Sequence, residues 1–209
     1  MFIKVNFRLF VVIIGSFVLI WTGCASPIQT LEIYNNGQPK FAREYKVISN
    51  GLRKDSITVK LIKYYRNGMR QYQQDIINNQ ANGQYISWHS TGVKSAKGRY
   101  LNGELSHKWI WWGKDGLPDS TRTFRKEMLH GEYIDYFGNG KPHKLKEYVE
   151  NKKYGYYKEF DENGKKVSVG EYRNDIPHGN WVWWQNRIKT RELTYENGLK
   201  NGPFRIYDK

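Results

Sequence analysis

Tryptophans are the residues of this chain best suited to binding chemistry. They cluster in the segments Trp109-Ile110-Trp111-Trp112 and Trp181-Val182-Trp183-Trp184. An exposed indole ring can stack on a sugar, insert at a lipid interface or anchor a partner protein. The alternative is that the rings are buried against their neighbours. Even an exposed ring need not mark a binding site, because singly exposed apolar residues are ordinary. The candidate binding residues are Trp111, Trp183, Trp109, Trp112, Trp181 and Trp184.

Cys24 is the only cysteine, and the residues before it predict a lipid on its thiol. The chain begins with positive charge at Lys4 and Arg8, and the segment Leu9–Trp21 that follows has no charged residue. That segment is shorter than the roughly 20 residues of a membrane-spanning helix and fits the apolar core of an export signal. We expect residues 1–23 to be a lipoprotein signal peptide. An ordinary signal peptide cut elsewhere and an uncleaved anchor are the alternatives.

The residues around Cys24 resemble a bacterial lipobox, in which a small residue precedes a lipidated cysteine. Gly23 and Cys24 match that pattern, whereas Trp21 stands where an aliphatic residue is usual. Acyl chains would hold the protein at a membrane, since each buried CH₂ contributes about 0.8 kcal/mol. Ala25 differs from the aspartate that retains such proteins at the inner membrane of enteric-type bacteria. The resemblance therefore implies a cell-envelope protein, at the outer membrane facing the periplasm rather than at the inner membrane.

The rest of the chain repeats with a period of about 24 residues, which lies in the range typical of arrays of small structural units. Each anchor is followed by aromatic residues two and five positions later, and four anchors by a turn glycine nine positions later. Four periods also have an aromatic residue 17 positions after the anchor, and Tyr195 stands one place early in a fifth. Such arrays usually bind partners. The steps between anchors are equal except the last, which is one residue shorter; the anchors are Gly83, His107, Gly131, Gly155, Gly179 and Gly202.

Each period reads as two short strands and two turns. In the period that begins at Gly131, residues 133–137 are aromatic or β-branched at all positions but one, which suits a strand. Asn139-Gly140 then predicts a turn, and residues 144–149 form the return strand. We therefore expect an all-β fold: one elongated antiparallel sheet of tandem β-hairpins. The rings two and five positions after an anchor would face opposite sides of the sheet unless a bulge realigns them.

Position four after the anchor singles out two of the tryptophans. It holds Trp111 and Trp183 in two periods, whereas it is polar in three others. A ring at a position that is otherwise polar indicates a contact with a partner. The polar residues at this position are Ser87, Asp135 and Glu159.

The array extends from about Val59 to Lys209, and the residues before it are less regular. Leu31, Tyr34 and Gly37 fit a degenerate first repeat, followed by an insert around residues 49–51. We expect residues 24–58 to form a tether and this first repeat, and residues 59–209 to form the array. At the usual strand spacing the array is roughly 60 Å long.

The repeated phrase resembles the MORN repeat, and more closely its bacterial variant. The clearest copy runs from Gly170 to Trp181, and His130-Gly131-Glu132-Tyr133 is a second. The resemblance covers about residues 59–209 and departs from the usual repeat in having an aromatic residue where a further glycine often stands. It implies an elongated, gently curled β-sheet. Many bacterial proteins of this variant are classed as YwqK-like antitoxins, so the resemblance also implies that a toxin is a possible partner.

The sequence contains no recognisable catalytic or metal-binding set. His130 and His178 occupy equivalent positions two periods apart, about 19 Å by strand spacing, which is too far for one metal ion. We find no nucleophile elbow, no phosphate-binding glycine loop and no obvious pair of carboxylates, so we expect no enzyme, no metal and no cofactor.

The charge of the chain is strongly positive. It has 34 basic and 20 acidic residues, and of these only Lys4 and Arg8 lie within residues 1–23. The chain that remains after removal of a signal peptide therefore stays basic, which predicts attraction to anionic partners. Export makes nucleic acid an unsuitable partner.

These observations favour a lipid-anchored, non-enzymatic scaffold that binds a protein or an envelope component through an aromatic and basic face. An antitoxin or immunity protein that neutralises a toxin is the first alternative, and it depends on the family resemblance. A glycan-active envelope enzyme is a weaker alternative, because catalytic groups can also meet from distant positions in a sequence.

Overall fold

The computed structural model describes residues 13–14, 17–18, 26–50, 53–202 and 204–207. All regular structure in these residues is β-strand, as the repeat predicted. Cys24 and Trp21 lie outside the described residues. The strands are β1 (Ile13–Ile14), β2 (Phe17–Val18), β3 (Ile28–Ile33), β4 (Pro39–Asn50), β5 (Arg53–Tyr64), β6 (Arg70–Ile77), β7 (Gln80–Trp88), β8 (Lys94–Leu101), β9 (Glu104–Trp112), β10 (Pro118–Arg125), β11 (Met128–Tyr136), β12 (Pro142–Val149), β13 (Lys152–Phe160), β14 (Lys166–Arg173), β15 (Ile176–Gln185), β16 (Ile188–Glu196), β17 (Leu199–Lys200) and β18 (Arg205–Ile206).

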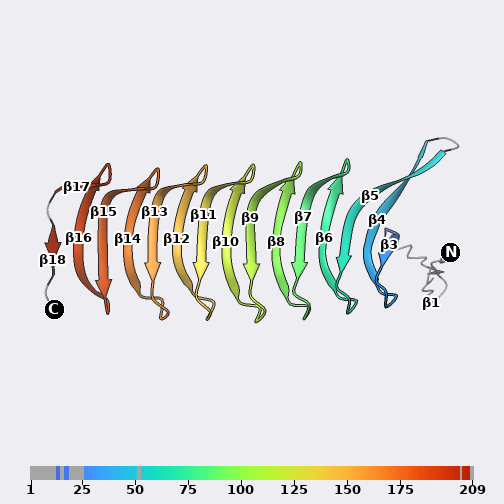
Figure 1. Ribbon diagram of the computed structural model, residues 1–209, viewed down its shortest axis with the longest axis horizontal. Helices are drawn as coiled ribbons and strands as arrows, with labels where there is room; N and C mark the ends of the chain where they lie inside the picture. The colour runs from blue at the N-terminus through green and yellow to red at the C-terminus, as the bar shows by residue number, and fades with distance from the viewer. Residues whose placement is uncertain (1–12, 15–16, 19–25, 51–52, 203, 208–209) are drawn as a thin grey trace.

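Strands β3 to β18 form one open antiparallel sheet of 16 strands. From β3 to β17 they follow each other in chain order, and β18 pairs with β16. Figure 1 shows them side by side in a long row, with β3 at one end and β18 at the other. The predicted single elongated sheet of tandem hairpins is therefore confirmed. Strands β1 and β2 pair only with each other.

The hairpin of β4 and β5 is longer than the others. Its outer part pairs regularly from Tyr45 with Thr58 to Asn50 with Arg53. Figure 1 shows this part projecting beyond the edge of the row. The insert expected near residues 49–51 is thus an extension of one hairpin, and β5 runs across residues 58 and 59 without a break.

The two edges of the sheet use different turns. At one edge two residues connect the strands and both have positive φ, for example Asn102 (51°) and Gly103 (85°). At the other edge, where the connections are longer, the amide of His89 donates to the carbonyl of Val93 (2.7 Å), and the Gly92 amide donates to the His89 carbonyl (2.9 Å). Gly92 has a φ of 88°, which a residue without Cβ adopts at least cost.

The last hairpin departs from this scheme. Strands β15 and β16 meet at the edge of the longer turns, but only Asn186 and Arg187 join them, with φ of 51° and 72°. Trp184 therefore pairs with Lys189, whereas the equivalent Trp88 pairs with Lys94, one residue further along the chain. This missing residue explains why the last step of the repeat is shorter than the others.

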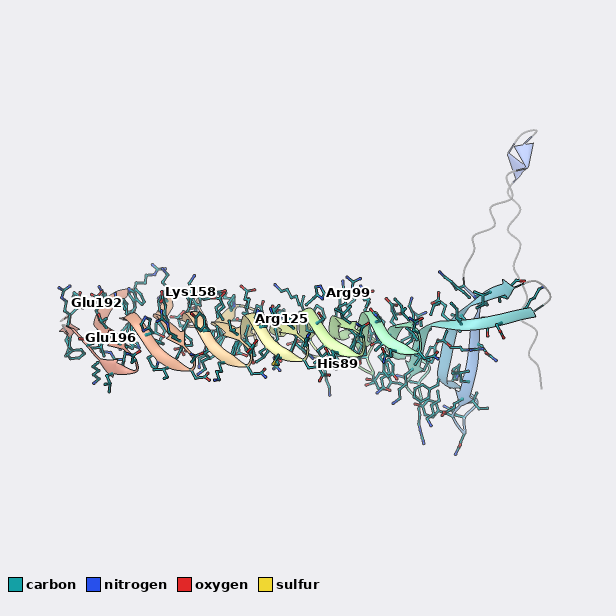
Figure 2. All side chains as sticks on the ribbon, turned by 90° about the horizontal axis from the view of Figure 1, so that it is seen from above. His89, Arg99, Arg125, Lys158, Glu192 and Glu196 are labelled. Carbon is teal, nitrogen blue, oxygen red and sulfur yellow. The ribbon has the colours of Figure 1, made fainter. Side chains whose placement is uncertain are left out.

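Aromatic columns lie on both faces of the sheet. Tyr133 and Tyr136 stand on the same strand three residues apart, and the ring of Tyr133 contacts Tyr148. The Tyr136 hydroxyl lies 3.4 Å from Thr121 Oγ1, and Thr121 pairs with Ile134. The register shift next to Tyr136 places the extra residue on the partner strand, so it does not bring the two rings to one face. Figure 2 shows side chains standing on both sides of the ribbon along the array.

The sheet has little depth for a core. Most side chains of its strands are half-buried, and few apolar ones are fully enclosed. The fold is therefore stabilised mainly by contacts between neighbouring strands. The buried apolar residues are Ala42, Ile62, Ile76, Ala96, Trp109, Trp181 and Leu193.

Candidate binding face

One face of the sheet carries three groups of ring contacts, and we call it the ring face. It comprises the aromatic residues two and 17 positions after each anchor, together with Trp111 and Trp183. In the first part of the array the Tyr85 and Trp109 centroids are 5.5 Å apart, and the Trp109 and Trp111 rings stack at 5.7 Å. The same arrangement recurs three periods later, where Trp181 lies 5.4 Å from Tyr157 and 5.8 Å from Trp183.

Tyrosine rings from the return strands contact the two buried tryptophans edge-on. Tyr100 meets Trp109 at 5.1 Å with an interplanar angle of 88°, and Tyr172 meets Trp181 at 5.1 Å and 84°. Edge-to-face pairs of this kind contribute about 0.5–1.5 kcal/mol beyond the area they bury. Burial raises the pKa of the hydroxyls of both tyrosines. These rings are therefore part of the packing of the sheet.

Trp109 and Trp181 are the buried members of the ring face, with 3% and 6% of their surface exposed. Each indole lies over a glycine of the preceding strand, Trp109 over Gly98 and Trp181 over Gly170. A Cβ on Gly98 would lie 2.0 Å from the ring, and one on Gly170 would lie 2.1 Å from it. So little exposed surface gives these two tryptophans a packing role, and the prediction that they bind a partner directly stays a prediction.

The glycines under the two buried indoles were missed by the sequence analysis. Their signal is nevertheless present, because Gly98 precedes Trp109 by the same interval as Gly170 precedes Trp181. Where a tyrosine takes the place of the tryptophan, the residue at that interval before it is large: Gln74, Arg122 and Lys146 precede Tyr85, Tyr133 and Tyr157. A small residue thus accompanies each large ring.

Each buried indole also has a hydrogen-bond acceptor. Trp109 Nε1 donates to the Arg99 carbonyl and Trp181 Nε1 to the Glu171 carbonyl, both at 3.2 Å. A buried indole N–H without an acceptor would cost stability. The equivalent bonds in the two repeats therefore fix both rings in the same orientation.

Trp111 and Trp183 remain half-exposed on the ring face. Trp111 pairs across the sheet with Ala96 and Ser120, and its ring meets Phe124 edge-on at 6.3 Å. Trp183 pairs with Ser168 and Arg191. Each of the two rings therefore stacks on a buried tryptophan and still presents part of its surface to solvent.

Arginines cover part of these two rings. The Arg122 guanidinium carbon lies 4.9 Å from the Trp111 centroid and 5.1 Å from that of Tyr133. The Arg191 guanidinium carbon lies 3.8 Å from the Trp183 centroid. Within the described residues, neither arginine has a carboxylate within ion-pair distance. The ring face therefore combines aromatic surface with uncompensated positive charge.

Two carboxylates lie on the ring face between the tryptophan pairs. Asp135 accepts from Lys146 Nζ at 3.0 Å. Glu159 accepts from the hydroxyls of Tyr157 and Ser168, each at 3.0 Å. Burial raises the pKa of Glu159, but these hydrogen bonds and the charge of Lys144 outweigh it, so the net pKa lies below its usual value. Glu159 is therefore held as an anion.

Trp112 and Trp184 lie on the opposite face, one residue along the strand from Trp111 and Trp183. Both are half-buried. The Lys166 ammonium stands 5.9 Å from the Trp184 centroid. The structure thus separates the six candidate tryptophans into a buried pair, a half-exposed pair on the ring face and a half-exposed pair on the other face.

The described residues contain neither a metal site nor a membrane-spanning helix. No three histidine, aspartate, glutamate or cysteine side chains there lie close enough together to hold a metal ion. The same residues contain no helix that is long and apolar enough to cross a bilayer.

Two solved structures are distantly similar to this chain. No family model and no curated protein matches the sequence. Among solved structures, the chain is similar at 12% identity and a TM-score of 0.25 to the "GtfA/B complex bound to UDP and GlcNAc", of which it spans 22% while 60% of this chain is covered. It is similar at 9% identity and a TM-score of 0.19 to a porin-like protein from Bacteroides uniformis, with 82% of this chain and 85% of that chain covered. The resemblance to MORN repeats therefore depends on the repeated residues alone.

Proposed function

We propose that this protein is a lipid-anchored, non-enzymatic scaffold that binds a protein or an anionic envelope component through the ring face. The observation that carries the proposal is the pair Trp111 and Trp183, half-exposed and accompanied by Arg122 and Arg191 without carboxylate partners. Aromatic residues and arginine are the types most enriched at the centres of binding interfaces. Unpaired guanidinium groups on the same surface attract anionic partners.

The spacing of the two tryptophans supports an extended partner. Trp111 and Trp183 are three periods apart, which is six strands or roughly 29 Å at the usual strand spacing. A partner that contacts both must therefore be a protein surface or a polymer. A rigid sheet holds the two contact points at a fixed distance, which lowers the entropic cost of binding such a partner.

The carboxylates of the ring face support a non-enzymatic role. Glycoside hydrolysis requires one carboxylic acid whose raised pKa keeps it protonated, opposite a second ionised carboxylate. Glu159 has the opposite shift, because hydrogen bonds from Tyr157 and Ser168 stabilise its anion. Asp135 forms an ion pair with Lys146. Both groups are arranged as structural ion pairs of the sheet.

Capture experiments test the binding proposal. Immobilised wild-type chain should retain an envelope component that the double variant Trp111→Ala/Trp183→Ala retains at least about tenfold more weakly. Trp88→Ala/Trp112→Ala is the matched control, because it removes two half-exposed indoles outside the ring face. Equal retention by the two double variants would contradict the proposal. A captured toxin would favour the narrower antitoxin function that the MORN-variant resemblance implies.

The lipid anchor is tested separately. We expect metabolic labelling with a fatty acid to modify the wild-type chain and to leave Cys24→Ser unlabelled. Fractionation of the labelled cells should place the wild type with the outer membrane. An unlabelled wild type would contradict the anchor without affecting the ring face.

A further inference from the structure

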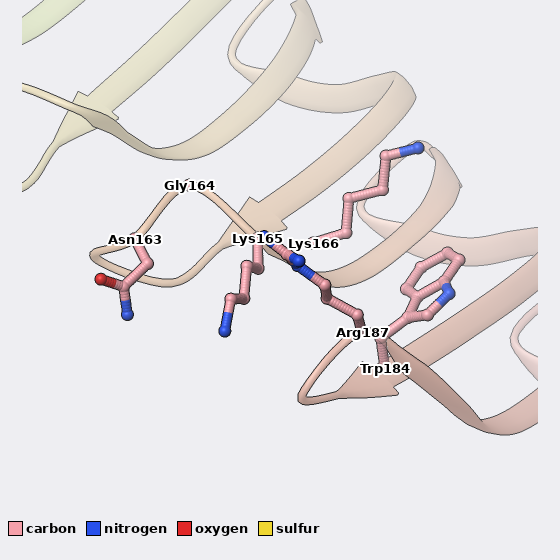
Figure 3. A pocket seen from close by; sticks show the side chains of 6 residues that line it. All are labelled: Asn163, Gly164, Lys165, Lys166, Trp184 and Arg187. Atoms are coloured by element: carbon pink, nitrogen blue, oxygen red, sulfur yellow. The ribbon is translucent and has the colours of Figure 1, made fainter.

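A pocket lies at the edge of the sheet where the last repeat is one residue short. Its volume is about 330 Å³. Figure 3 shows Arg187 reaching from its turn toward Lys165 and Lys166, with the Trp184 ring beside Lys166. The pocket is lined by Asn163, Gly164, Lys165, Lys166, Trp184 and Arg187.

The shortened turn creates this pocket. In the preceding repeat an asparagine of the longer turn bonds to the next turn, as Asn139 Nδ2 does to the Glu162 carbonyl at 3.0 Å. Asn163 holds the equivalent place in its own turn, but the next turn consists only of Asn186 and Arg187. The Asn163 side chain has no hydrogen bond to another described residue. Its amide is therefore a free donor at the pocket.

The charge at the pocket is positive. Lys165, Lys166 and Arg187 form no ion pair within the described residues. The nearby carboxylate of Asp161 is engaged inside its own turn, where it accepts from the backbone amides of Asn163 and Lys165 at 2.9 Å each. Three cations, an amide donor and an indole ring thus line one pocket, with no carboxylate among the lining residues.

We propose that this pocket binds a phosphate ester, with the phosphate among Lys165, Lys166 and Arg187 and the attached sugar or glycerol carbons against Trp184. A dianionic phosphate suits three cations better than a singly charged carboxylate does, because each oxygen can accept a charge-assisted hydrogen bond. Arginine offers two parallel donors to phosphate oxygens, and lysine adds a point charge. The indole supplies the apolar surface on which a polyhydroxylated carbon skeleton packs.

This site is independent of the proposed function of the ring face. Trp184 stands on the other face from Trp183, and none of the pocket residues belongs to the ring face. The phosphate ester could belong to a soluble phosphorylated sugar, which is a dianionic monoester, or to the headgroup of an anionic lipid such as phosphatidylglycerol, which is a singly charged diester.

Nuclear magnetic resonance of the Trp184 indole N–H tests the proposal directly. The full chain, in micelles of an uncharged polyoxyethylene detergent, is titrated with glucose 6-phosphate and with glucose, and Trp184→Phe assigns the resonance. In a separate sample, phosphatidylglycerol is added to the micelles. We expect glucose 6-phosphate or phosphatidylglycerol to shift the resonance, and glucose alone to leave it in place.

Two sets of variants distinguish binding in the pocket from non-specific attraction to the basic surface of the protein. Lys166→Gln/Arg187→Asn should weaken binding at least about tenfold, since it removes two charge-assisted contacts. Asparagine at 187 retains the preference for positive φ that the turn needs. Lys141→Gln is the control, because Lys141 holds the place of Lys165 one period earlier, beside a full-length turn.

An insertion removes the pocket without changing any charge. One glycine between Arg187 and Ile188 would give the order of Trp88-His89-Ser90-Thr91-Gly92-Val93-Lys94 and restore the full step of the repeat. We expect the restored turn to cover Asn163 and to abolish the shift.

A shift with glucose 6-phosphate identifies a soluble phosphorylated sugar as a source of the phosphate, and a shift with phosphatidylglycerol alone identifies a lipid headgroup. No shift with either compound would overturn the proposal. So would a shift with glucose as large as with its phosphate, or equal affinity in the Lys166→Gln/Arg187→Asn and Lys141→Gln variants.

Discussion

At the scale of single residues, the size of one side chain sets the size of its neighbour across the strands. Gly98 lies between Tyr85 and Trp109, and only a hydrogen at its α-carbon leaves room for the indole. Gly98 has no positive φ, so steric space and not backbone conformation requires glycine here. The same reasoning applies to Gly170 beneath Trp181.

We predict that Gly98→Ala destabilises the protein by about 2–3 kcal/mol, because its Cβ would overlap the Trp109 ring. Chemical denaturation measures the change. Gly138→Ala is the control and should be nearly neutral, because a Cβ there meets nothing within 4 Å. Replacing Trp109 by tyrosine in the Gly98→Ala background should recover part of the loss. A Gly98→Ala variant as stable as Gly138→Ala would contradict the steric account.

We predict that the C-terminal end of the sheet loosens in acid through Glu192. Its carboxylate accepts from Lys189, Asn180 and Tyr207, and these bonds lower its pKa from 4.5 to about 2. A lowered pKa in the folded state stabilises the fold above pH 4.5, and that contribution is lost as the pH falls toward 2. The protection factors of the β16 amides, which compare each exchange rate with the intrinsic rate at the same pH, should therefore fall over this range of pH.

The matched variant for this pH dependence is Glu192→Gln. It keeps the shape of the side chain but cannot titrate, so the protection factors of β16 should be lower near neutral pH and vary less with pH. Figure 2 shows Glu192 near the C-terminal end of the array. Wild-type protection factors that stay constant as the carboxylate is protonated would rule out this role.

At the scale of elements, the two-residue turns impose one backbone requirement on many different sequences. Both central residues need positive φ, which asparagine and glycine adopt most readily. Asn102-Gly103 meets the requirement, whereas Lys126 and Glu127 are held at 50° and 63°. Neighbouring strands hold this less suitable pair in place, so the turn stores a modest strain.

We predict that Lys126→Asn/Glu127→Gly stabilises the protein by about 1–2 kcal/mol, because it relieves two residues from the left-handed region. The midpoint of chemical denaturation should rise. The reverse exchange in the equivalent turn, Asn102→Lys/Gly103→Glu, should lower that midpoint by a similar amount. If both exchanges shift it in the same direction, the strain does not reside in these turns.

At the scale of the whole molecule, the array is stabilised by nearest neighbours. Each strand from β4 to β15 pairs with the strands before and after it, and the buried rings contact only adjacent repeats. Stability in such arrays is approximately a sum of terms for each repeat and for each interface. The number of repeats can therefore change without altering the local structure.

We predict that deletion of residues 131–154 preserves the fold. Gly155 would replace Gly131, and Tyr157 would take the place of Tyr133 opposite Arg122. Circular dichroism should show an unchanged β spectrum and a cooperative melt. Deletion of residues 131–153 is the control: one residue fewer shifts the register and turns the side chains of that strand to the other face. Equal melting of the two variants would contradict the nearest-neighbour account.

The repeat by itself determined the fold class, the order of the strands and the positions of the turns. This was possible because each hairpin forms between residues that are close in the sequence. A single period therefore contains both the alternating strand residues and the turn glycines, such as Gly92 and Gly140. The spacing of Trp109, Trp111 and Trp112 also identified where aromatic surface gathers.

Only the tertiary structure decided which of these rings are accessible. Trp109 lies over Gly98 and is enclosed by the rings of Tyr85 and Tyr100 from the neighbouring strands. Trp111 stacks on Trp109 and meets Phe124 edge-on, and it stays half-buried. The pocket beside Trp184 likewise depends on the meeting of two turns, one of which is a residue short. The pairing of residues between neighbouring strands sets these contacts. The residues of a single repeat do not specify that pairing.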